Sequence, residues 1–282
     1  MPKHAFLILA HTNAAFLQTL VNCLDHPMNE LFIHWDAKSG VLPELSAKTS
    51  PIRFTPNRVN VHWGDFSVVE AEYALFREAR RNGHYQYYHL ISGADLPIKS
   101  MEEIHRLCDD HPDTEYIGFS KPAEGEVDWR VNHYFLFPHR FSSEDKIIRA
   151  IRKLANVFQD ALKIRRQPGI FKKGPQWVSV SEAFVDFILS SEEIIRKMFR
   201  RTYCPDELYK QTLCWNSSFK ARVPGTDDEF EGCRRYIKWE NGQLFSLSEK
   251  DVPAMLGSDR WFARKFAPDD QETIKQVLSS IR

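Results

Sequence analysis

Apolar runs and amphipathic stretches alternate along the first 120 residues of the chain. The apolar runs are rich in β-branched and aromatic side chains, which predicts buried strands. These runs cover residues 5–10, 31–35, 59–63, 85–92 and 116–119. Apolar residues at every third or fourth position predict helices over residues 14–24, 68–79 and 101–108. Strands that alternate with helices in this way predict an α/β fold with a mostly parallel central sheet flanked by helices.

The remainder of the chain has a less regular pattern. Its clearest periodicity predicts a helix with a basic outer face over residues 147–164. Ser67 and Glu70 have the spacing of a capping box at the start of an earlier helix. Further patterns predict a helix capped within 179–182, helices that end near 213 and begin near 269, and a strand over 235–239. Since no linker rich in Gly, Ser or Pro and no internal repeat occurs, we expect one domain over residues 1–282.

The strand predicted over 85–92 ends in Ser92-Gly93-Ala94-Asp95-Leu96-Pro97. Gly93 permits a tight turn, and Pro97 prevents the strand from continuing. Asp95 is therefore expected on a loop at the carboxyl edge of the sheet, where ligands bind in open α/β folds. A solvated turn explains the same residues equally well.

Composition and charge narrow the class of protein. The 38 basic residues equal the 38 acidic ones, which argues against a protein that coats nucleic acid. The five cysteines are scattered and form no CxxC pair, so we expect neither a zinc site nor a disulfide framework. The N-terminal apolar run is too short to cross a bilayer and lacks a signal-peptide pattern. We therefore expect a cytoplasmic protein with reduced thiols. The 13% of aromatic residues suit a sugar-binding protein and a large aromatic core alike.

Three charged residues are candidates for chemistry, each with an ordinary structural alternative. Glu207 follows Pro205 and Asp206 at a predicted helix start, a position that favours acids and would also keep a general base ionised. Arg235 faces the same side of its predicted strand as Ile237, so an anionic partner is expected for it. Lys265 lies among aromatic residues. Either cation can be a surface residue, or both can bind one diphosphate.

Several metal and nucleotide motifs are missing from the sequence. No Asp-x-Asp pair, GxGxxG, GxxxxGK or GxSxG segment occurs. The nearest acidic group that could hold a divalent metal is Glu124, Glu126 and Asp128, which also has the character of a solvated loop. We therefore expect no metal site.

Together these segments resemble the core-2/I-branching β-1,6-N-acetylglucosaminyltransferase family, which includes the peptide O-xylosyltransferases. The resemblance extends over nearly the whole chain in the family's order. It is carried by residues 5–11, Ile33-His34-Trp35-Asp36-Ala37-Lys38, Trp63-Gly64 with Ser67-Val68, Leu90-Ile91-Ser92-Gly93-Ala94-Asp95-Leu96-Pro97-Ile98, Gly174-Pro175-Gln176-Trp177, Pro205-Asp206-Glu207, Arg235-Tyr236-Ile237 and Phe262-Ala263-Arg264-Lys265-Phe266.

The resemblance implies a GT-A fold and an inverting, metal-independent transfer from a UDP-sugar to a glycan hydroxyl. It implies that Glu207 is the catalytic base and that Arg235 and Lys265 replace a metal at the diphosphate. It places residues 1–120 in the nucleotide-sugar half and residues 121–282 in the acceptor-binding and catalytic half. The donor site it implies comprises Asp36 near the uracil, Asp95 near the sugar, and Trp63, Gly64, Ser92, Gln176 and Trp177.

The chain differs from the animal members of this family, because it shows no membrane anchor, stem or disulfide set. We therefore expect a compact bacterial relative, attached at most peripherally to the inner face of the membrane, that acts in surface polysaccharide or glycoconjugate synthesis. The expected partners are a UDP-sugar, with GlcNAc as the transferred group, and a glycan or glycolipid. No nucleic acid and no further cofactor are expected.

Other functions are compatible with the same sequence. The donor can be UDP-xylose, and a non-catalytic protein of this fold can bind a nucleotide sugar or a glycan. A structural protein with an aromatic core is a third alternative. The acceptor site is expected in the middle segment, where Arg130, His133 and Tyr134 are candidate contacts or residues of an ordinary surface loop.

Overall fold

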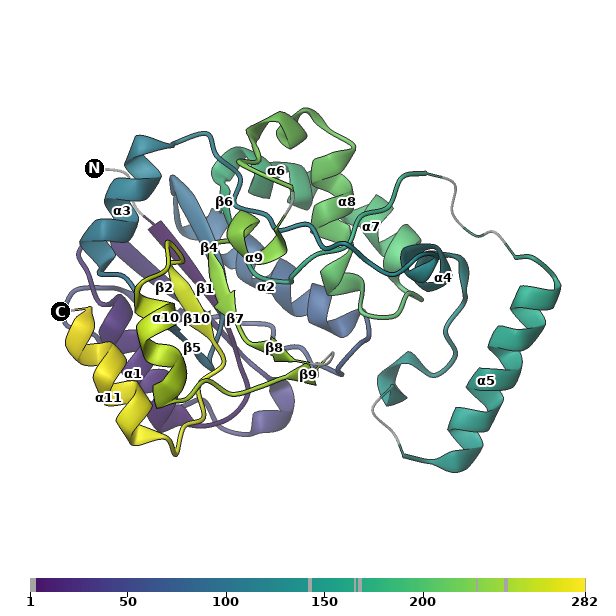
Figure 1. The fold of residues 1–282 in the computed structure, drawn as a ribbon, viewed down its shortest axis with the longest axis horizontal. Helices are drawn as coiled ribbons and strands as arrows, with labels where there is room; N and C mark the ends of the chain where they lie inside the picture. Colours follow the sequence, from purple (N-terminus) through teal and green to yellow (C-terminus); the bar gives the residue numbers. More distant parts are fainter. Residues whose placement is uncertain are drawn as a thin grey trace.

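The computed structural model describes residues 4–141, 144–164, 166, 169–226, 228–240 and 243–281. A five-stranded sheet in the order β3–β2–β1–β4–β6 forms its centre (Figure 1). The strands are β1 (His4–Ala10), β2 (Asn29–Trp35), β3 (Ile52–Phe54), β4 (Tyr87–Ser92) and β6 (Val178–Ser181). The first four run parallel, and β6 is antiparallel to β4. The predicted α/β class with a mostly parallel central sheet flanked by helices is confirmed.

Helices pack on both faces of this sheet. Successive strand residues point to opposite faces, so Phe6 and Ile8 join one buried apolar cluster while Ala5 and Leu7 join the other. The first cluster is completed by α1 (Ala14–Leu24), α3 (Met101–Asp110), α10 (Val252–Leu256) and α11 (Gln271–Ser280). The second is completed by α2 (Ser67–Asn82), α6 (Glu182–Ser190), α7 (Glu192–Phe199) and α8 (Tyr209–Trp215). Burial on both faces explains why these strands are largely apolar.

A small second sheet joins three short strands that are far apart in sequence. It has the order β5 (Asp95–Pro97), β10 (Phe262–Arg264) and β7 (Arg235–Ile237). Arg264 lies opposite Asp95 in the antiparallel pair, and Phe262 lies opposite Arg235 in the parallel pair. Asp95 was predicted on a loop, whereas it begins a strand. A two-stranded ribbon of β8 (Trp239–Glu240) and β9 (Gln243–Leu244) follows.

The strand predicted over residues 59–63 is absent from the described structure, and β3 is found instead. The backbone of this segment has other partners. The amide of Val59 donates to the His34 side chain at 2.9 Å, and its carbonyl accepts from the amide of Ala37. The Arg58 guanidinium binds the carbonyls of Trp35, Asp36 and Gly40. The alternating apolar residues of 59–63 therefore belong to an irregular loop and not to a strand.

Three local predictions need correction. Residues 116–119 form only one isolated bridge, between Tyr116 and Ser179, rather than a strand. Ser67 is the first residue of α2 and not its cap; the Asp65 carboxylate accepts from its amide at 2.6 Å. Residues 178–181 form β6 before Ser181 caps α6, so the pattern showed the cap but not the strand.

The remaining helices are α4 (Glu126–Asn132), α5 (Lys146–Ala161) and α9 (Glu229–Gly232), and the 3₁₀ turns are η1 (Ala37–Ser39), η2 (Pro138–Arg140), η3 (Pro205–Glu207), η4 (Ser218–Arg222) and η5 (Glu249–Asp251). Figure 1 shows α4 and α5 on the side of the molecule away from α1 and α11. In the described ranges, no helix combines the length and apolar character needed to cross a membrane.

Candidate active site

A cavity of about 720 Å³, here called the central cavity, opens beside the main sheet. Gln176 and Trp177 line it immediately before β6 begins. Because β6 is antiparallel to β4 and Val178 lies opposite Leu90, these two residues lie near the carboxyl end of β4. That edge is where open α/β sheets bind ligands.

The structure brings half of the predicted site residues to this cavity. Its wall includes Trp63, Gly64, Gln176, Trp177 and Glu207. The other predicted residues do not line it; they are Asp36, Ser92, Asp95, Arg235 and Lys265. Of the expected acceptor contacts, Arg130 lies in the wall, whereas His133 and Tyr134 do not.

Glu207 is held in the cavity wall by an ion pair. Its Oε2 lies 2.8 Å from Nη1 of Arg130 on α4. The other side of this guanidinium lies 2.8 Å from Oε1 of Glu126, which also accepts from Lys173 at 2.9 Å. The Glu207 side chain is 31% exposed, so a ligand in the cavity can reach it. The result is a carboxylate in a fixed position, open on one side, as a general base requires.

The loop opposite Glu207 depends on a glycine. Gly64 has φ of 80° and its carbonyl accepts from the amide of Cys204 at 2.8 Å. A Cβ at Gly64 would lie 3.2 Å from the Tyr203 ring. Gly64 therefore lets the loop that carries Trp63 approach the segment that leads into η3.

A second carboxylate lies next to Glu207 but is buried. Asp206 is 9% exposed, and among the described residues its Oδ1 has no hydrogen-bond partner. Burial, together with the charges of Glu207 and Glu72, raises the pKa of Asp206 to about 7. The two adjacent acids therefore differ in their surroundings: Asp206 is buried, whereas Glu207 is neutralised by a nearby guanidinium.

Below the cavity, a buried network fixes the helix that follows η3. Lys210 and Glu72 are both fully buried, with Nζ 2.6 Å from Oε2. The hydroxyl of Tyr209 donates to the same carboxylate oxygen. Oε1 of Glu72 accepts from the Gln176 amide at 2.8 Å. The network thus connects α2 and α8 with a residue of the cavity wall, which keeps that wall rigid.

The cation that faces the central cavity from the small sheet is Arg264. Its guanidinium lies 4.3 Å from the centre of the Trp177 ring. Nη1 lies 2.8 Å from Oδ1 of Asp95, and the Ser92 amide donates to Oδ2 at 2.8 Å. Burial raises the pKa of Asp95, while Arg264 and the Ser92 amide oppose that change. Asp95 and Ser92 therefore orient Arg264 from behind and do not form the wall themselves.

Arg235, which was predicted to contact a diphosphate, is enclosed by backbone carbonyls in this structure. The side chain is 1% exposed and lies outside the cavity wall. Its guanidinium donates to the carbonyls of Cys233, Leu90 and Val178 and to the hydroxyl of Ser179. The expected anionic partner is replaced by carbonyl oxygens. Burial lowers the pKa of Arg235 to about 10. In this structure Arg235 joins β7 to the main sheet.

The other two predicted residues lie at the margins of the site. Asp36 is buried after β2, where it accepts from the Lys38 amide at 2.8 Å. Lys265 follows Arg264 and is half-buried. Its ammonium forms no hydrogen bond or ion pair with any residue that the structure describes, which leaves it available for an anionic ligand.

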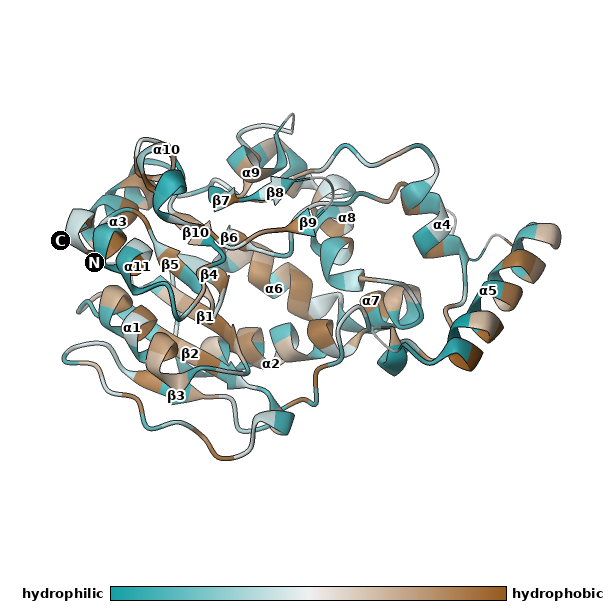
Figure 2. Cartoon of the chain, turned by 60° about the horizontal axis from the view of Figure 1, so that its bottom comes forward, coloured by the Kyte–Doolittle hydropathy of each residue, from teal (hydrophilic) through white to brown (hydrophobic). Residues whose placement is uncertain are grey.

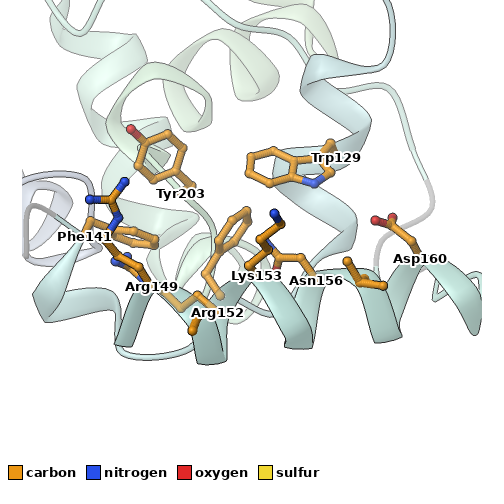
Figure 3. A pocket seen from close by; sticks show the side chains of 11 residues that line it. Trp129, Phe141, Arg149, Arg152, Lys153, Asn156, Asp160 and Tyr203 are labelled. Atoms are coloured by element: carbon orange, nitrogen blue, oxygen red, sulfur yellow. The ribbon is translucent and has the colours of Figure 1, made fainter. Parts of the chain in front are cut away.

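A second cavity, of about 800 Å³ and here called the α5 cavity, lies between α5 and the body (Figure 3). The aromatic rings of Trp129, Phe141 and Tyr203 face three cations of α5 across it. These cations are Arg149, Arg152 and Lys153. Tyr203 lines both cavities, and Trp129 precedes the Arg130 that binds Glu207. The two cavities therefore meet close to the candidate base.

Sequence reasoning missed several residues of the central cavity, including Arg264, Lys173, Tyr203 and Glu229. Arg264 carried a signal, because it forms a charged pair with Lys265 between aromatic residues. Lys173 and Tyr203 lie in irregular segments, and Glu229 begins the four-residue helix α9, so their side-chain directions could not be inferred from periodicity.

An α/β sheet with a charged cavity at its carboxyl edge is typical of enzymes that bind small polar ligands. Residues 4–270 match the family model described as Core-2/I-Branching enzyme. The chain belongs to that family.

Distant relatives agree with this membership. The chain is 24% identical over 204 residues to xylosyltransferase sqv-6 of Caenorhabditis elegans. That alignment covers 68% of this chain and 24% of the relative. It is 21% identical over 296 aligned positions to mouse (Mus musculus) beta-1,3-galactosyl-O-glycosyl-glycoprotein beta-1,6-N-acetylglucosaminyltransferase 4, covering 93% of this chain and 61% of that protein. The chain thus spans only part of the length of either relative. A crystal structure of mouse xyloside xylosyltransferase 1 in its apo form aligns with a TM-score of 0.37 at 12% identity, over 93% of this chain and 97% of that one.

Proposed function

We propose that this chain is an inverting glycosyltransferase that moves a sugar from a UDP-sugar to a hydroxyl of a glycan. The observation that carries the proposal is the Glu207–Arg130 ion pair in a cavity that also holds Arg264. The cavity thus has a fixed carboxylate for the acceptor and a cation for the leaving group. Family membership supports the same reaction class.

The proposed reaction is a single displacement. The acceptor oxygen attacks the anomeric carbon of the donor while its proton moves to Glu207. The bond between that carbon and the β-phosphate oxygen breaks, and UDP departs with the bonding electrons. Arg264 and Lys265 stabilise the negative charge that grows on the diphosphate, a contribution of about 3 kcal/mol in comparable sites. Attack from the side opposite the leaving group inverts the anomeric centre.

GlcNAc is the donor sugar that we propose, with xylose as the alternative. The match to the N-acetylglucosaminyltransferase extends over 93% of this chain, against 68% for the xylosyltransferase. A screen of UDP-GlcNAc, UDP-xylose, UDP-glucose and UDP-galactose by thermal shift and UDP release tests this choice. At equal concentration, a donor that binds more tightly should raise the unfolding temperature more. Binding of UDP without release from any donor, over a broad acceptor panel, would instead favour a binding protein.

The acceptor is proposed to approach through the α5 cavity. Tyr203 forms part of both cavities, and the aromatic rings of Trp129 and Phe141 can stack on sugar rings. The proposed acceptor site thus lies in the middle segment, as the sequence analysis expected.

We further propose that no divalent metal takes part, so EDTA should leave the rate of transfer unchanged. Glu126, the acid of the middle segment nearest the base, is already neutralised by Arg130 and Lys173. UDP release measured with EDTA and with added Mn²⁺ checks this expectation. A strict requirement for Mn²⁺ would contradict it.

A further inference from the structure

Helix α5 borders the α5 cavity along one of its sides. Gln159 accepts from the Tyr134 amide at 2.7 Å, and Oδ1 of Asp160 lies 3.0 Å from Nε2 of His133. These contacts attach the end of α5 to the segment that follows α4, and so fix which side of the helix faces the cavity. Figure 2 shows α5 at the edge of the molecule, with hydrophilic and hydrophobic residues alternating along it. The cavity volume of about 800 Å³ lies within the range of about 300–1,000 Å³ that is usual for ligand sites.

The side of α5 that faces the cavity carries three cations, Arg149, Arg152 and Lys153 (Figure 3). Their spacing of three and four residues makes them neighbours on the helix surface, where like charges repel one another. Within the described ranges, none of the three side chains forms an ion pair or a hydrogen bond. The Arg152 guanidinium lies 5.4 Å from the centre of the Phe141 ring, a contact that supplies no anion. Three clustered positive charges therefore lack a counter-charge from the described chain.

The rest of the cavity does not neutralise these charges. Among the described residues that line it, Asp160 is the only acid, and its carboxylate already contacts His133. A cleft lined mainly by one sign of charge raises the local concentration of ions of the opposite sign. We therefore expect the ligand of this cavity to carry negative charge.

The wall opposite the cations is aromatic. It is formed by the rings of Trp129, Phe141 and Tyr203, and Trp129 is 39% exposed. Such rings offer flat apolar surface to a sugar ring, whereas guanidinium groups offer paired N–H donors to a carboxylate or a phosphate. Asn156 on α5 adds an amide that can bind a hydroxyl group. Rings on one wall and cations on the other suit a saccharide that carries acidic groups.

We propose that the α5 cavity binds an anionic saccharide, whose carboxylate or phosphate groups contact Arg149, Arg152 and Lys153. This inference rests on the proposed function, because it assigns a chemical class to the acceptor. Tyr203 lines both cavities, so a saccharide in the α5 cavity can extend toward Glu207. A neutral glycan would leave the three cations uncompensated. Nucleic acid also combines rings with phosphates, but the chain has 38 basic and 38 acidic residues and no excess of positive charge.

The test is isothermal titration calorimetry of the full chain, without donor, against two pairs of probes. The first pair is tetragalacturonate and its fully methyl-esterified, neutral form. The second pair is glucose 6-phosphate and glucose. We expect at least one anionic probe to bind at least about tenfold more tightly than its neutral form, and more weakly in high salt. The pair that shows this difference identifies the acidic group as a carboxylate or a phosphate.

A matched pair of double variants locates the binding. Arg149→Gln with Lys153→Gln should lower the affinity for the anionic probe at least about tenfold. Lys197→Gln with Arg200→Gln, at the end of α7, is the control, because it removes the same two charges from exposed residues outside the cavity wall. Its affinity should equal that of the parent. Unchanged unfolding temperatures would show that both double variants fold.

Three results would overturn the proposal. They are equal or absent binding of the charged and neutral probes, equal affinity of the two double variants, and displacement of the bound saccharide by UDP, which would assign the cations to the donor. Binding of an anionic probe by a chain that transfers no sugar would contradict the proposed function and leave this inference intact. Transfer to a neutral glycan without binding of either anionic probe would do the reverse.

Discussion

Arg235 and Arg264 come from the same small sheet but have opposite surroundings. Arg264 reaches the central cavity over Trp177, while Arg235 is enclosed by backbone carbonyls. The sequence could indicate that Arg235 faces inward. It could not show that the main sheet covers that side, because the cover is formed by β4 and β6, more than fifty residues away in the chain. Glu207, in contrast, was predicted from its motif and does line the cavity.

Lys265 and Arg235 can be separated by one pair of variants. We expect Lys265→Ala to weaken UDP binding roughly tenfold, since a hydrogen bond to a charged group contributes about 1.5–3 kcal/mol. The unfolding temperature of this variant should not change, because the Lys265 ammonium has no hydrogen-bond or ion-pair partner among the described residues. Arg235→Met should instead lower the unfolding temperature. Titration calorimetry and thermal unfolding measure the two effects, and an unaltered UDP affinity of Lys265→Ala would remove this residue from the site.

The Arg264–Asp95 pair should stabilise the fold as a unit. Arg264→Ala leaves the Asp95 carboxylate buried without its cation, and we expect a loss of about 3 kcal/mol in the free energy of unfolding. Asp95→Asn should cost less when Arg264 is already absent than when it is present. Urea unfolding of both single variants and the double variant forms the required cycle. Strictly additive effects would contradict the coupling.

Elements with a strong local signal were predicted well, and elements set by distant contacts were not. The helix predicted over 14–24 is α1 with the same bounds. Residues 59–63 have an equally clear strand pattern, but the backbone of Val59 is bound by His34 and Ala37. The short strands β5 and β10 exist only because they pair with each other across more than 160 residues.

A buried group of histidines on β1, β4 and α3 predicts how stability depends on pH. His4 lies 3.1 Å from His89, and His105 binds Asn29 at 2.7 Å. Burial lowers the pKa of His4 to about 3 and that of His105 to about 4, against about 6.5 for unfolded histidine. Below pH 6.5 the unfolded chain therefore binds protons that the native chain excludes, and stability falls as the pH falls toward 4.

The contribution of the histidines is isolated by His105→Gln, which keeps a donor for Asn29 but cannot titrate. Urea unfolding between pH 7 and pH 4 should show a smaller loss of stability for this variant than for the parent. Buried carboxyl groups with raised pKa act in the opposite direction, so the difference between the two proteins is the relevant quantity. Parallel curves for the two proteins would contradict neutral burial of His105.

At the scale of the whole molecule, the central cavity is assembled from segments that span most of the chain. The loop of Trp63, helix α4, the residues before β6, η3 and β10 each contribute to its wall. The family resemblance predicted most of these segments, and membership in the family is established over residues 4–270. The division into residues 1–120 and 121–282 stays a prediction, although β6 of the second part completes the sheet of the first.

The middle segment shows what sequence patterns leave open. Periodicity predicted a helix over 147–164 with a basic face, and α5 covers Lys146–Ala161. It could not show that the basic side faces the α5 cavity while the apolar side faces outward. This arrangement is the reverse of the usual one, because the apolar side of a helix is normally buried.

Transfer by Glu207→Gln, measured beside UDP affinity, tests the central claim most directly. The substitution keeps the size of the side chain and removes its ability to accept a proton at neutral pH. We expect transfer to fall at least about 100-fold while UDP affinity stays close to that of the parent. Glu126→Gln removes the other carboxylate on Arg130 and serves as the control, with most of its transfer retained. Full transfer by Glu207→Gln, or an equal loss in both variants, would contradict Glu207 as the base.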